Sequence, residues 1–515
     1  MPRATALDRL TALSRPAPLL LITLILRGSV VFLRQFFSGD EAIYAALAVR
    51  MLHGHLLYAG AVDHKPPGVS VLYAAVFFVA GQNHLAAVRT VLILVVWATA
   101  VVVGRIGATL AGSGATMAGL LYTCASAAGE PRDAMAANTE LFLNLPIALA
   151  ALLVARRYAA AHGGASAGTL SGRAGALFLA GALTALGGLF KYQSSLAGIA
   201  WVAALLVSER PSARLASGLA ALAAGFLLVA AGVCGFFYLR GAWDPFVFWA
   251  WQYNFSYIGA LSSHDVLRNF LKGTPEMALF WSPLLGLAAV AIAARRVDFL
   301  TAAWLAAMCL AITVGGRYFR FYHLMALPAL SIAAAAGAIV LAERRSRWGR
   351  LAAGLLAASV IVSAVFPWIW WKVQPAFERE HETLLAVGDY IRTHSAPGAR
   401  LFVWGNSPQI YAFADREMAT RFVFCNYHIG KIWGSWAWDV DAGDTSQYVV
   451  PRAWTELLED LDRAPPDLIV DGGAGRLANF DRHPISRYPQ LAARLKGYRL
   501  EAVIAGVPVY RRIGG

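Results

Sequence analysis

The sequence predicts a polytopic α-helical membrane protein with a small α/β domain at its C-terminal end. Hydrophobic residues make up 58% of the 515 residues and charged residues only 14%. The mean hydropathy of +0.55 is too high for a soluble globular chain of this length. Several apolar runs reach the roughly 20 residues that a helix needs to cross a bilayer. After residue 371 the composition turns polar, which indicates a separate domain.

The apolar runs predict about eleven transmembrane helices. Two runs, 114–128 and 194–208, are short for a full crossing, so tilted or re-entrant helices leave the count open by about one or two. The predicted spans cover residues 19–38, 86–110, 114–128, 141–156, 173–189, 194–208, 215–239, 278–294, 299–315, 324–342 and 351–371.

The distribution of arginine predicts the orientation of these spans. Much of the net charge of +14 lies in short loops that fall on one side of the membrane, as the positive-inside rule requires. No basic stripe with interleaved aromatic residues occurs, so nucleic acid is not an expected partner. We expect a multi-pass protein of the cytoplasmic (inner) membrane with its N-terminus inside. The loop arginines are Arg156, Arg157, Arg210, Arg214, Arg295, Arg296, Arg344, Arg345, Arg347 and Arg350.

The polar tail reads as an α/β domain on the outer side. Residues 381–395 have helical spacing, 399–405 and 466–472 have the pattern of strands ending in glycine, and 500–512 are typical of a closing hairpin. The predicted division is a transmembrane domain over 1–371, with a first outer loop at 39–85, and an extracytoplasmic domain over 372–515.

Two short motifs of the first outer loop could carry chemistry. GDEAIYA (39–45) places Asp40 and Glu41 side by side at the membrane edge. The alternative is that these acids only begin a surface helix, since acids stabilise helix N-termini. VDHKPPG (62–68) follows, and its two prolines restrict the backbone around Lys65.

Two later segments fall on the same predicted side. GEPRDAMAANTELFLNLP (129–146) and GGRYFRFYHLMALP (315–328) add further acids and cations. Acids and cations where a membrane meets water suit a phosphate-bearing lipid and a proton-donating acceptor. The added residues are Glu130, Asp133, Glu140, Arg317, Arg320 and His323.

The order of these elements resembles the GT-C superfamily of integral-membrane glycosyltransferases. Within it, the likeness is to bacterial aminoarabinose transferases of lipid A and to protein O-mannosyltransferases, and it covers most of the chain. The order and spacing of the motifs together carry the resemblance. The matching residues are Arg27, 39–58, 65–68, Arg89, 137–142, 190–193, 317–328 and 387–422.

The resemblance implies an inverting transfer of a sugar from a polyprenyl-phosphate donor to a lipid, glycan or protein acceptor on the outer face of the membrane. Asp40 falls on the family's first acid, whose implied role is general base on the acceptor hydroxyl. Glu41 would orient the acceptor or tune that base. The family's second acid maps best to Glu140, and less closely to Glu130 or Asp133.

The resemblance also implies a set of cations around the donor phosphate. Lys65 would hold this phosphate as a point charge. Lys191 is a second candidate ligand, unless it only extends to lipid headgroups. For Arg317, Arg320 and His323 the alternatives are a clamp on the phosphate and anchoring at the membrane interface.

One departure from the family bears on cofactors. Some relatives have a metal-binding acid immediately before the Lys-Pro pair, where this chain has His64. Imidazole can bind zinc, so His64 is a candidate ligand of a divalent metal, with His264 or a carboxylate as its partner. The alternative is that His64 is an ordinary solvated loop residue.

Two other function classes compete with glycosyl transfer. A flippase or transporter of lipid-linked glycans would place charges near the membrane midplane and repeat its halves, and the sequence shows neither feature. A ligase or phosphotransferase acting on undecaprenyl-linked glycans is the second alternative. Aromatic residues of WDPFVFWAWQYNFSY (243–257) are candidates for stacking on a sugar ring or lipid.

Overall fold

The computed structural model describes residues 6–163, 174–343 and 375–514, together with 354, 358, 362, 364 and 365. Its Cα positions divide into two compact units, each made of separate stretches of the chain. Unit 1 contains Met1–Leu33, Val88–Phe236 and Asn269–Val373, and unit 2 contains Arg34–Ala87, Phe237–Arg268 and Gln374–Gly515. The predicted domain boundary follows chain order, whereas unit 2 joins the first outer loop to the tail.

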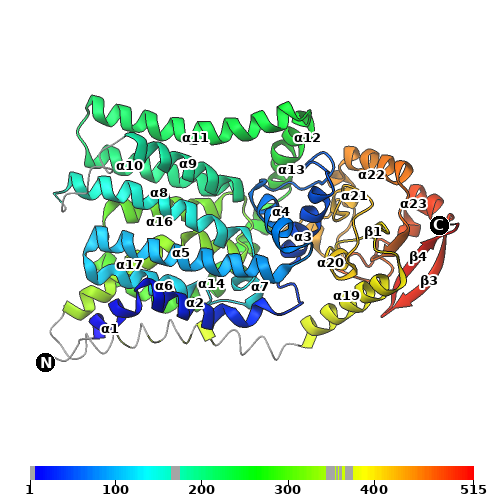
Figure 1. Ribbon diagram of the computed structural model, residues 1–515, viewed down its shortest axis with the longest axis horizontal. Coiled ribbons are helices and arrows are strands. Elements are labelled where there is room, and N and C mark those ends of the chain that lie inside the picture. The colour runs from blue at the N-terminus through cyan, green and yellow to red at the C-terminus, as the bar shows by residue number, and fades with distance from the viewer. Residues whose placement is uncertain are drawn as a thin grey trace. The chain divides into compact units, whose positions relative to one another are not determined.

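Unit 1 is a bundle of apolar helices that pack side by side (Figure 1). Its elements, some of which begin or end just inside unit 2, are α1 (Ala6–Leu13), α2 (Pro16–Val31), α5 (Leu85–Ala111), η1 (Ser113–Met117), α6 (Ala118–Ala125), α7 (Pro131–Ala134), α8 (Thr139–Ala161), α9 (Ala174–Phe190), η2 (Tyr192–Leu196), α10 (Ala197–Ser208), α11 (Ala213–Leu239), α14 (Ser263–Phe280), α15 (Ser282–Ala293), α16 (Phe299–Thr313), η4 (Arg320–Ala326) and α17 (Leu327–Glu343).

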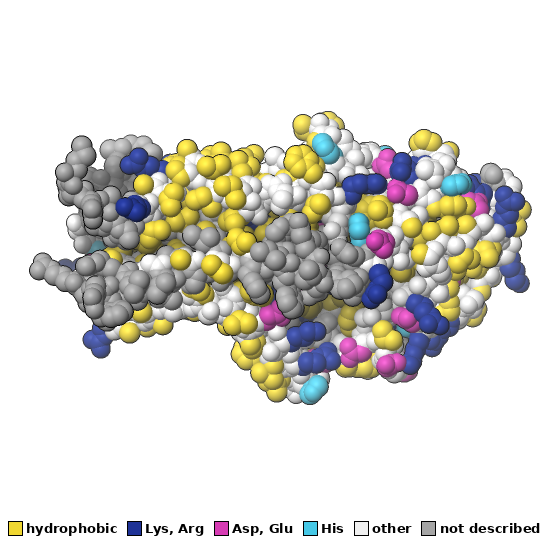
Figure 2. Space-filling model, turned by 90° about the horizontal axis from the view of Figure 1, so that it is seen from below, with side chains coloured by type: hydrophobic (Ala, Val, Ile, Leu, Met, Phe, Trp, Pro, Cys, Tyr) yellow, Lys and Arg dark blue, Asp and Glu magenta, His cyan; other side chains and the backbone are white. Residues whose placement is uncertain are grey.

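Glycines let neighbouring helices of unit 1 approach closely. A Cβ atom on Gly181 of α9 would collide with the backbone of α11, and one on Gly337 of α17 would collide with α15. Such small-residue contacts are typical of helices that associate in lipid, where backbone proximity replaces hydrophobic driving force. Among the described side chains that Figure 2 shows over these helices, hydrophobic ones are many and charged ones few.

Every predicted span from 19–38 to 324–342 falls largely on helical residues, but 278–294 crosses the bend between α14 and α15, and the number of crossings stays a prediction. Among the described residues, four helices are long and apolar enough to cross a membrane, or up to five if the bent pair Ser263–Phe280 and Ser282–Ala293 is one span. Most of the predicted span 351–371 and most of the loop 161–172 lie outside the described residues.

Unit 2 combines the first outer loop with the α/β tail. Within the loop, α3 (Gly39–Leu52) and the apolar α4 (Gly68–Ala80) pack together, and α4 had no counterpart among the expected elements. Its other elements are α12 (Trp243–Val247), the π-helical turn η3 (Phe248–Gln252), α13 (Tyr253–Gly259), α19 (Pro375–His394), β1 (Leu401–Trp404), α20 (Gln409–Ala414), α21 (Asn426–Ile429), η5 (Trp436–Trp438), η6 (Ser446–Tyr448), α22 (Pro451–Arg463), β2 (Leu468–Asp471), η7 (Ile485–Arg487), α23 (Pro489–Leu495), β3 (Tyr498–Ile504) and β4 (Val507–Arg512).

The tail forms a four-stranded sheet in the order β1-β2-β4-β3. β1 and β2 pair in parallel, and the β3–β4 pair is the predicted hairpin. Ala505 and Gly506 turn the hairpin with φ angles of 48° and 85°, as a tight two-residue turn requires. Lys, Arg, Asp and Glu side chains gather over this domain (Figure 2).

Candidate active site

Asp40 lies in the first turn of α3, and the sequence around it builds that helix start. The Ser38 hydroxyl accepts a hydrogen bond from the Glu41 backbone N–H at 3.3 Å. In return, Glu41 Oε2 accepts from the Phe37 N–H at 2.7 Å. The S-x-x-E spacing of residues 38–41 is that of a capping box, but the Glu41 carboxylate reaches one residue further back, to Phe37, which precedes the N-cap Ser38. Glu41 is fully buried, so its visible role is to fix the helix on which Asp40 stands.

The expected surface helix is a buried one. Every residue from Glu41 to Arg50 is buried, and Tyr44 packs edge-on against Tyr73 of α4 at 5.6 Å between ring centroids. Acids at the start of such a helix face the stabilising end of its dipole. The burial also limits which carboxylates a substrate could reach on this helix. Asp40 keeps 26% of its side-chain surface exposed.

Lys65 lies in a loop whose backbone is held at several points. The Tyr58 hydroxyl donates to the Lys65 carbonyl at 2.8 Å. Asn254 of α13 donates from Nδ2 to the His64 carbonyl at 2.7 Å. The Asp63 carboxylate accepts from the His64 N–H at 2.7 Å. Together with the two prolines that follow, these bonds fix the backbone from which the Lys65 side chain extends.

Asp40 and Lys65 form the central ion pair of this candidate site. Lys65 Nζ donates to Asp40 Oδ1 at 2.7 Å and lies 4.7 Å from the centroid of the Tyr44 ring. Burial alone would lower the pKa of Lys65, but Asp40, Tyr44 and Asp63 outweigh it and hold this pKa well above its ordinary value. Lys65 is therefore a permanent cation, and its side chain keeps 22% of its surface exposed.

This arrangement can serve two chemical tasks. An accessible carboxylate can accept a proton from a hydroxyl group. A fixed ammonium group can stabilise negative charge on a phosphate as a bond to it breaks. In the described structure the two groups neutralise each other, so an anionic ligand must compete with Asp40 for Lys65.

His64 faces aromatic rings. Its Nδ1 lies 3.1 Å from the Tyr427 hydroxyl, and its ring lies 4.7 Å from that of Tyr257 and 5.5 Å from that of Tyr253. The aromatic residues of 243–257 that were candidates for sugar stacking thus pack in part against His64. The imidazole is buried, which contradicts the solvated-loop alternative.

The two candidate metal ligands do not form a cluster. His264 is an exposed residue of α14, whereas His64 is buried. Within the ranges that the structure describes, no group of three His, Cys, Asp or Glu side chains is arranged to hold a metal ion. A divalent metal at His64 or His264 stays a prediction.

Glu140 and Lys191 form a second ion pair, inside unit 1. Glu140 begins α8 and is fully buried, and Lys191 Nζ donates to its Oε1 at 2.6 Å. The ammonium group also lies 3.0 Å from the centroid of the Tyr322 ring. Lys191 is thus enclosed by a carboxylate and an aromatic face, and the side chain retains 11% of its surface exposed.

Arg320 is surrounded by three carboxylates in unit 1. Its Nε donates to Asp133 at 2.6 Å, its Nη1 donates to both Glu276 oxygens at 3.0 Å, and its Nη2 pairs with Glu130. Burial raises the pKa of Asp133 to about 6, with a further contribution from Glu130 and against the opposing effect of Arg320. A phosphate would have to displace several carboxylates to reach this arginine.

The neighbouring candidates Arg317 and His323 are also buried and hydrogen-bonded. Arg317 Nη1 donates to the Gly315 carbonyl at 3.1 Å. The two ring nitrogens of His323 lie 3.1 Å from the Arg320 carbonyl and 3.2 Å from the Thr274 hydroxyl. Their assignment to the donor phosphate stays a prediction.

Several residues of these clusters escaped the sequence-based search. Asp63 is fully buried two positions before Lys65, and burial raises its pKa. Its position within VDHKPPG was visible, but an Asp beside a turn is too common to stand out. Tyr44 and Glu276 approach the charged groups only through tertiary packing, which no local pattern reports.

Comparisons with solved structures identify the fold. The chain matches ArnT from Cupriavidus metallidurans bound to undecaprenyl phosphate with a TM-score of 0.61 and 14% identity, over 97% of this chain and 98% of that one. ArnT from the same organism in the apo state matches with a TM-score of 0.61 and 15% identity, over 96% of this chain and 97% of that one. A third match is the archaeal oligosaccharyltransferase AglB from Archaeoglobus fulgidus, in complex with an inhibitory peptide and a dolichol-phosphate. Its TM-score is 0.53 and its identity 11%, over 97% of this chain and 74% of that one.

No protein-family model and no curated protein sequence matches the chain. ArnT and AglB are both GT-C proteins, and the structural likeness extends over nearly the whole chain. At these low identities the likeness shows the fold. The chain therefore has the GT-C fold, and the predicted fold class is confirmed to this extent: the structure is mostly helical, with several apolar helices and a small C-terminal sheet.

Proposed function

From the GT-C fold we propose that this protein is an inverting glycosyltransferase that uses a polyprenyl-phosphate-linked sugar as donor. The observation that carries the proposal is the Asp40–Lys65 ion pair, which places an accessible carboxylate 2.7 Å from a fixed cation. Likeness to a protein bound to undecaprenyl phosphate and to another bound to a dolichol-phosphate supports the choice of donor.

The proposed reaction is one displacement at the anomeric carbon of the donor sugar. Asp40 takes the proton from an acceptor hydroxyl, and the hydroxyl oxygen forms a bond to that carbon. The bond from the carbon to the phosphate oxygen breaks on the opposite face, so the configuration inverts. The electron pair leaves with the polyprenyl phosphate, whose added negative charge Lys65 stabilises. General-base catalysis of this kind contributes about 10²–10⁴-fold in rate.

The acceptor is a lipid, a glycan or a protein on the outer face of the cytoplasmic membrane. The orientation rests on the loop arginines together with the position of GDEAIYA and the tail on the opposite predicted side. Membrane-impermeant cysteine labelling at Gly443→Cys, an exposed position of unit 2, tests it in whole cells. Labelling only after the inner membrane is broken would overturn the orientation.

The reaction itself is tested with purified protein in nanodiscs. Labelled polyprenyl-phosphate sugars and crude envelope acceptors are supplied, and label leaving the carrier is followed for wild type and Asp40→Asn. Transfer by wild type that is lost in the variant supports the proposal. Lipid movement across vesicles without transfer from any carrier would instead favour a flippase.

A further inference from the structure

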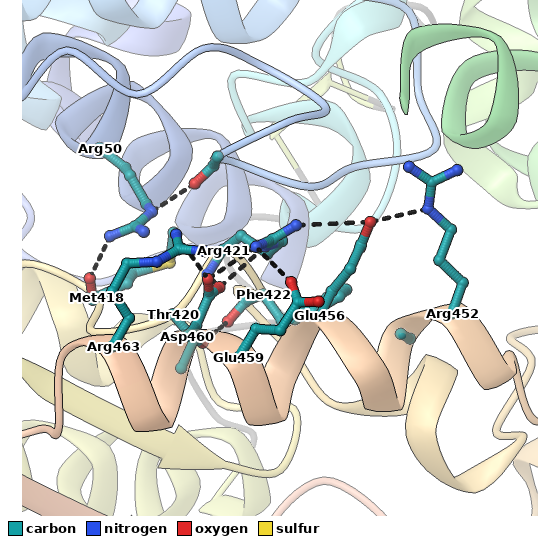
Figure 3. Close-up of polar contacts among 12 residues, drawn as sticks. Arg50, Met418, Thr420, Arg421, Phe422, Arg452, Glu456, Glu459, Asp460 and Arg463 are labelled. Atoms are coloured by element: carbon teal, nitrogen blue, oxygen red, sulfur yellow. Dashed lines mark hydrogen bonds and ion pairs between the residues drawn. The ribbon is translucent and has the colours of Figure 1, made fainter. Parts of the chain in front are cut away.

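The loop that carries Lys65 is fastened to the tail of the chain inside unit 2. Arg50, near the end of α3, donates from Nε to the Gly60 carbonyl at 2.5 Å and from Nη1 to the Met418 carbonyl at 2.5 Å. The arginine is buried, and Figure 3 shows it reaching toward Met418. One side chain therefore links the loop backbone to the tail backbone.

A second link lies closer to Lys65. The Val62 N–H donates to the Arg421 carbonyl at 2.8 Å, and Val62 and Phe422 form a parallel β-bridge. A strand-like contact thus begins three residues before Lys65. The position of this part of the loop depends on where residues 421 and 422 lie.

Arg421 is in turn fixed by one carboxylate of α22. Asp460 accepts from Arg421 Nε at 2.9 Å, from its Nη2 at 2.8 Å and from its backbone N–H at 2.8 Å. Glu456 lies farther from the guanidinium, at 3.5 Å. A bidentate pair with an added backbone bond specifies geometry more strictly than a single charge contact does. Figure 3 shows these groups converging on Arg421 from one side of α22.

Only Asp63 and His64 lie between Val62 and Lys65, and the backbone of this short segment is hydrogen-bonded. Tyr58 donates to the Lys65 carbonyl and Asn254 donates to the His64 carbonyl, so the backbone between Val62 and Lys65 is hydrogen-bonded at both ends. Misplacement of a catalytic group by about 1 Å can cost on the order of 10²-fold in rate. A fixed loop is therefore useful at this position.

We propose that Asp460 and Arg421 are positioning residues that hold Lys65 in place for the donor phosphate, acting through the Val62 backbone. This inference rests on the proposed function of Lys65. It assigns to the tail domain a role in donor binding, which neither the fold nor the resemblance supplies.

The experiment measures binding of undecaprenyl phosphate to the full-length protein in nanodiscs. Wild type, Lys65→Met, Asp460→Asn and the double variant are compared. Asp460→Asn should weaken binding about tenfold, and it should have no further effect in the Lys65→Met background, because residues that act through one another are not additive. Arg421→Lys, which keeps a charge but loses the bidentate fork, is the milder second variant.

Asp462→Asn is the matched control. Asp462 lies on the same helix and forms its own bidentate pair with Arg494, at 2.9 and 2.7 Å, on the exposed side of the domain. Within the part of the chain that the structure describes, its side chain pairs with Arg494 and not with the Val62 segment, so Asp462→Asn should leave binding unchanged. Hydrogen exchange of the Val62 amide, which needs no activity, should accelerate in Asp460→Asn and not in Asp462→Asn.

The outcomes separate this inference from the proposed function. Equal binding by wild type and Lys65→Met would overturn the role of Lys65, and the positioning role with it. Weak binding by Lys65→Met together with wild-type binding by Asp460→Asn would overturn the positioning role alone. So would additive effects in the double variant, or equal losses in Asp460→Asn and Asp462→Asn.

Discussion

Lys65 Nζ and Asp40 Oδ1 lie 2.7 Å apart, so the two groups that the proposed reaction assigns to different substrates are hydrogen-bonded to each other. Both side chains are partly exposed, and a ligand can reach them. A donor phosphate that attracts Lys65 would release Asp40 to act as a base. Donor binding before acceptor activation is the order that this contact favours.

The first prediction concerns Asp40→Asn. Turnover should fall by about 10²–10⁴-fold, because an amide cannot accept the proton of the acceptor hydroxyl. Binding of undecaprenyl phosphate should stay the same or tighten, because Lys65 no longer has an anionic partner. Steady-state transfer and direct binding, measured on the same preparation, check both parts. Asp441→Asn, at an exposed residue paired with Arg482, is the control and should behave as wild type. Weaker donor binding in Asp40→Asn would contradict the competition between Asp40 and the phosphate.

The second prediction concerns the cation. Lys65→Met should raise the KM for the donor and lower kcat, because Lys65 contacts the phosphate before and during bond breaking. Lys65→Arg should recover part of the donor affinity, since the charge is kept, but little of kcat, since a planar guanidinium does not reproduce a compact ammonium group. Titration of donor against a fixed acceptor separates the two constants. Full activity in Lys65→Arg would mean that the reaction needs only a positive charge at position 65 and not the compact shape of an ammonium group.

A structural feature can be predicted from the sequence when the residues that form it lie close together along the chain. The capped helix at Ser38–Glu41, the tail strands and the Ala505-Gly506 hairpin follow from spacing and turn chemistry, and the structure contains all of them. The predicted elements do not include the apolar α4, because it begins directly after Pro66-Pro67, inside the predicted first outer loop. The two prolines are typical of a loop, although a helix begins at the next residue.

The site was predicted only in part, and for a physical reason. Asp40 and Lys65 were both found as residue types, but their pairing joins positions 25 apart and arises from the packing of α3 against the loop. The enclosure of Arg320 by Glu130, Asp133 and Glu276 likewise joins three separate segments. Sequence patterns show charge and periodicity, whereas the ion-pair partners of Lys65 and Arg320 are determined by tertiary packing.

The third prediction concerns the buried pair Glu140–Lys191. Lys191→Met should lower the free energy of unfolding by about 3–5 kcal/mol, because it leaves a fully buried carboxylate without its counter-ion. The double variant Glu140→Gln/Lys191→Met should recover most of this loss. Thermal unfolding in detergent, followed for both variants, checks the difference. A double variant that is stable but inactive would show that the pair also serves the reaction, whereas recovered activity would make its role structural.

The last prediction concerns pH and Asp133. Burial raises the pKa of this carboxyl from 3.8 to about 6, so the folded state holds the proton over a pH range in which the unfolded state has lost it. Stability should therefore be highest below about pH 4, fall as pH rises toward about 6 and then level off. At about 1.4 kcal/mol per pKa unit, the total loss is on the order of 3 kcal/mol.

Asp133→Asn tests this prediction because its amide oxygen can still accept the hydrogen bond from Arg320 Nε. Melting temperatures of wild type and variant are measured from pH 4.5 to pH 7.5, and only their difference is interpreted, since other groups titrate equally in both. The wild type should lose stability relative to the variant as pH rises. Parallel curves would mean that Arg320 outweighs burial and that Asp133 is ionised throughout, which would make the three carboxylates around Arg320 a permanently anionic cluster.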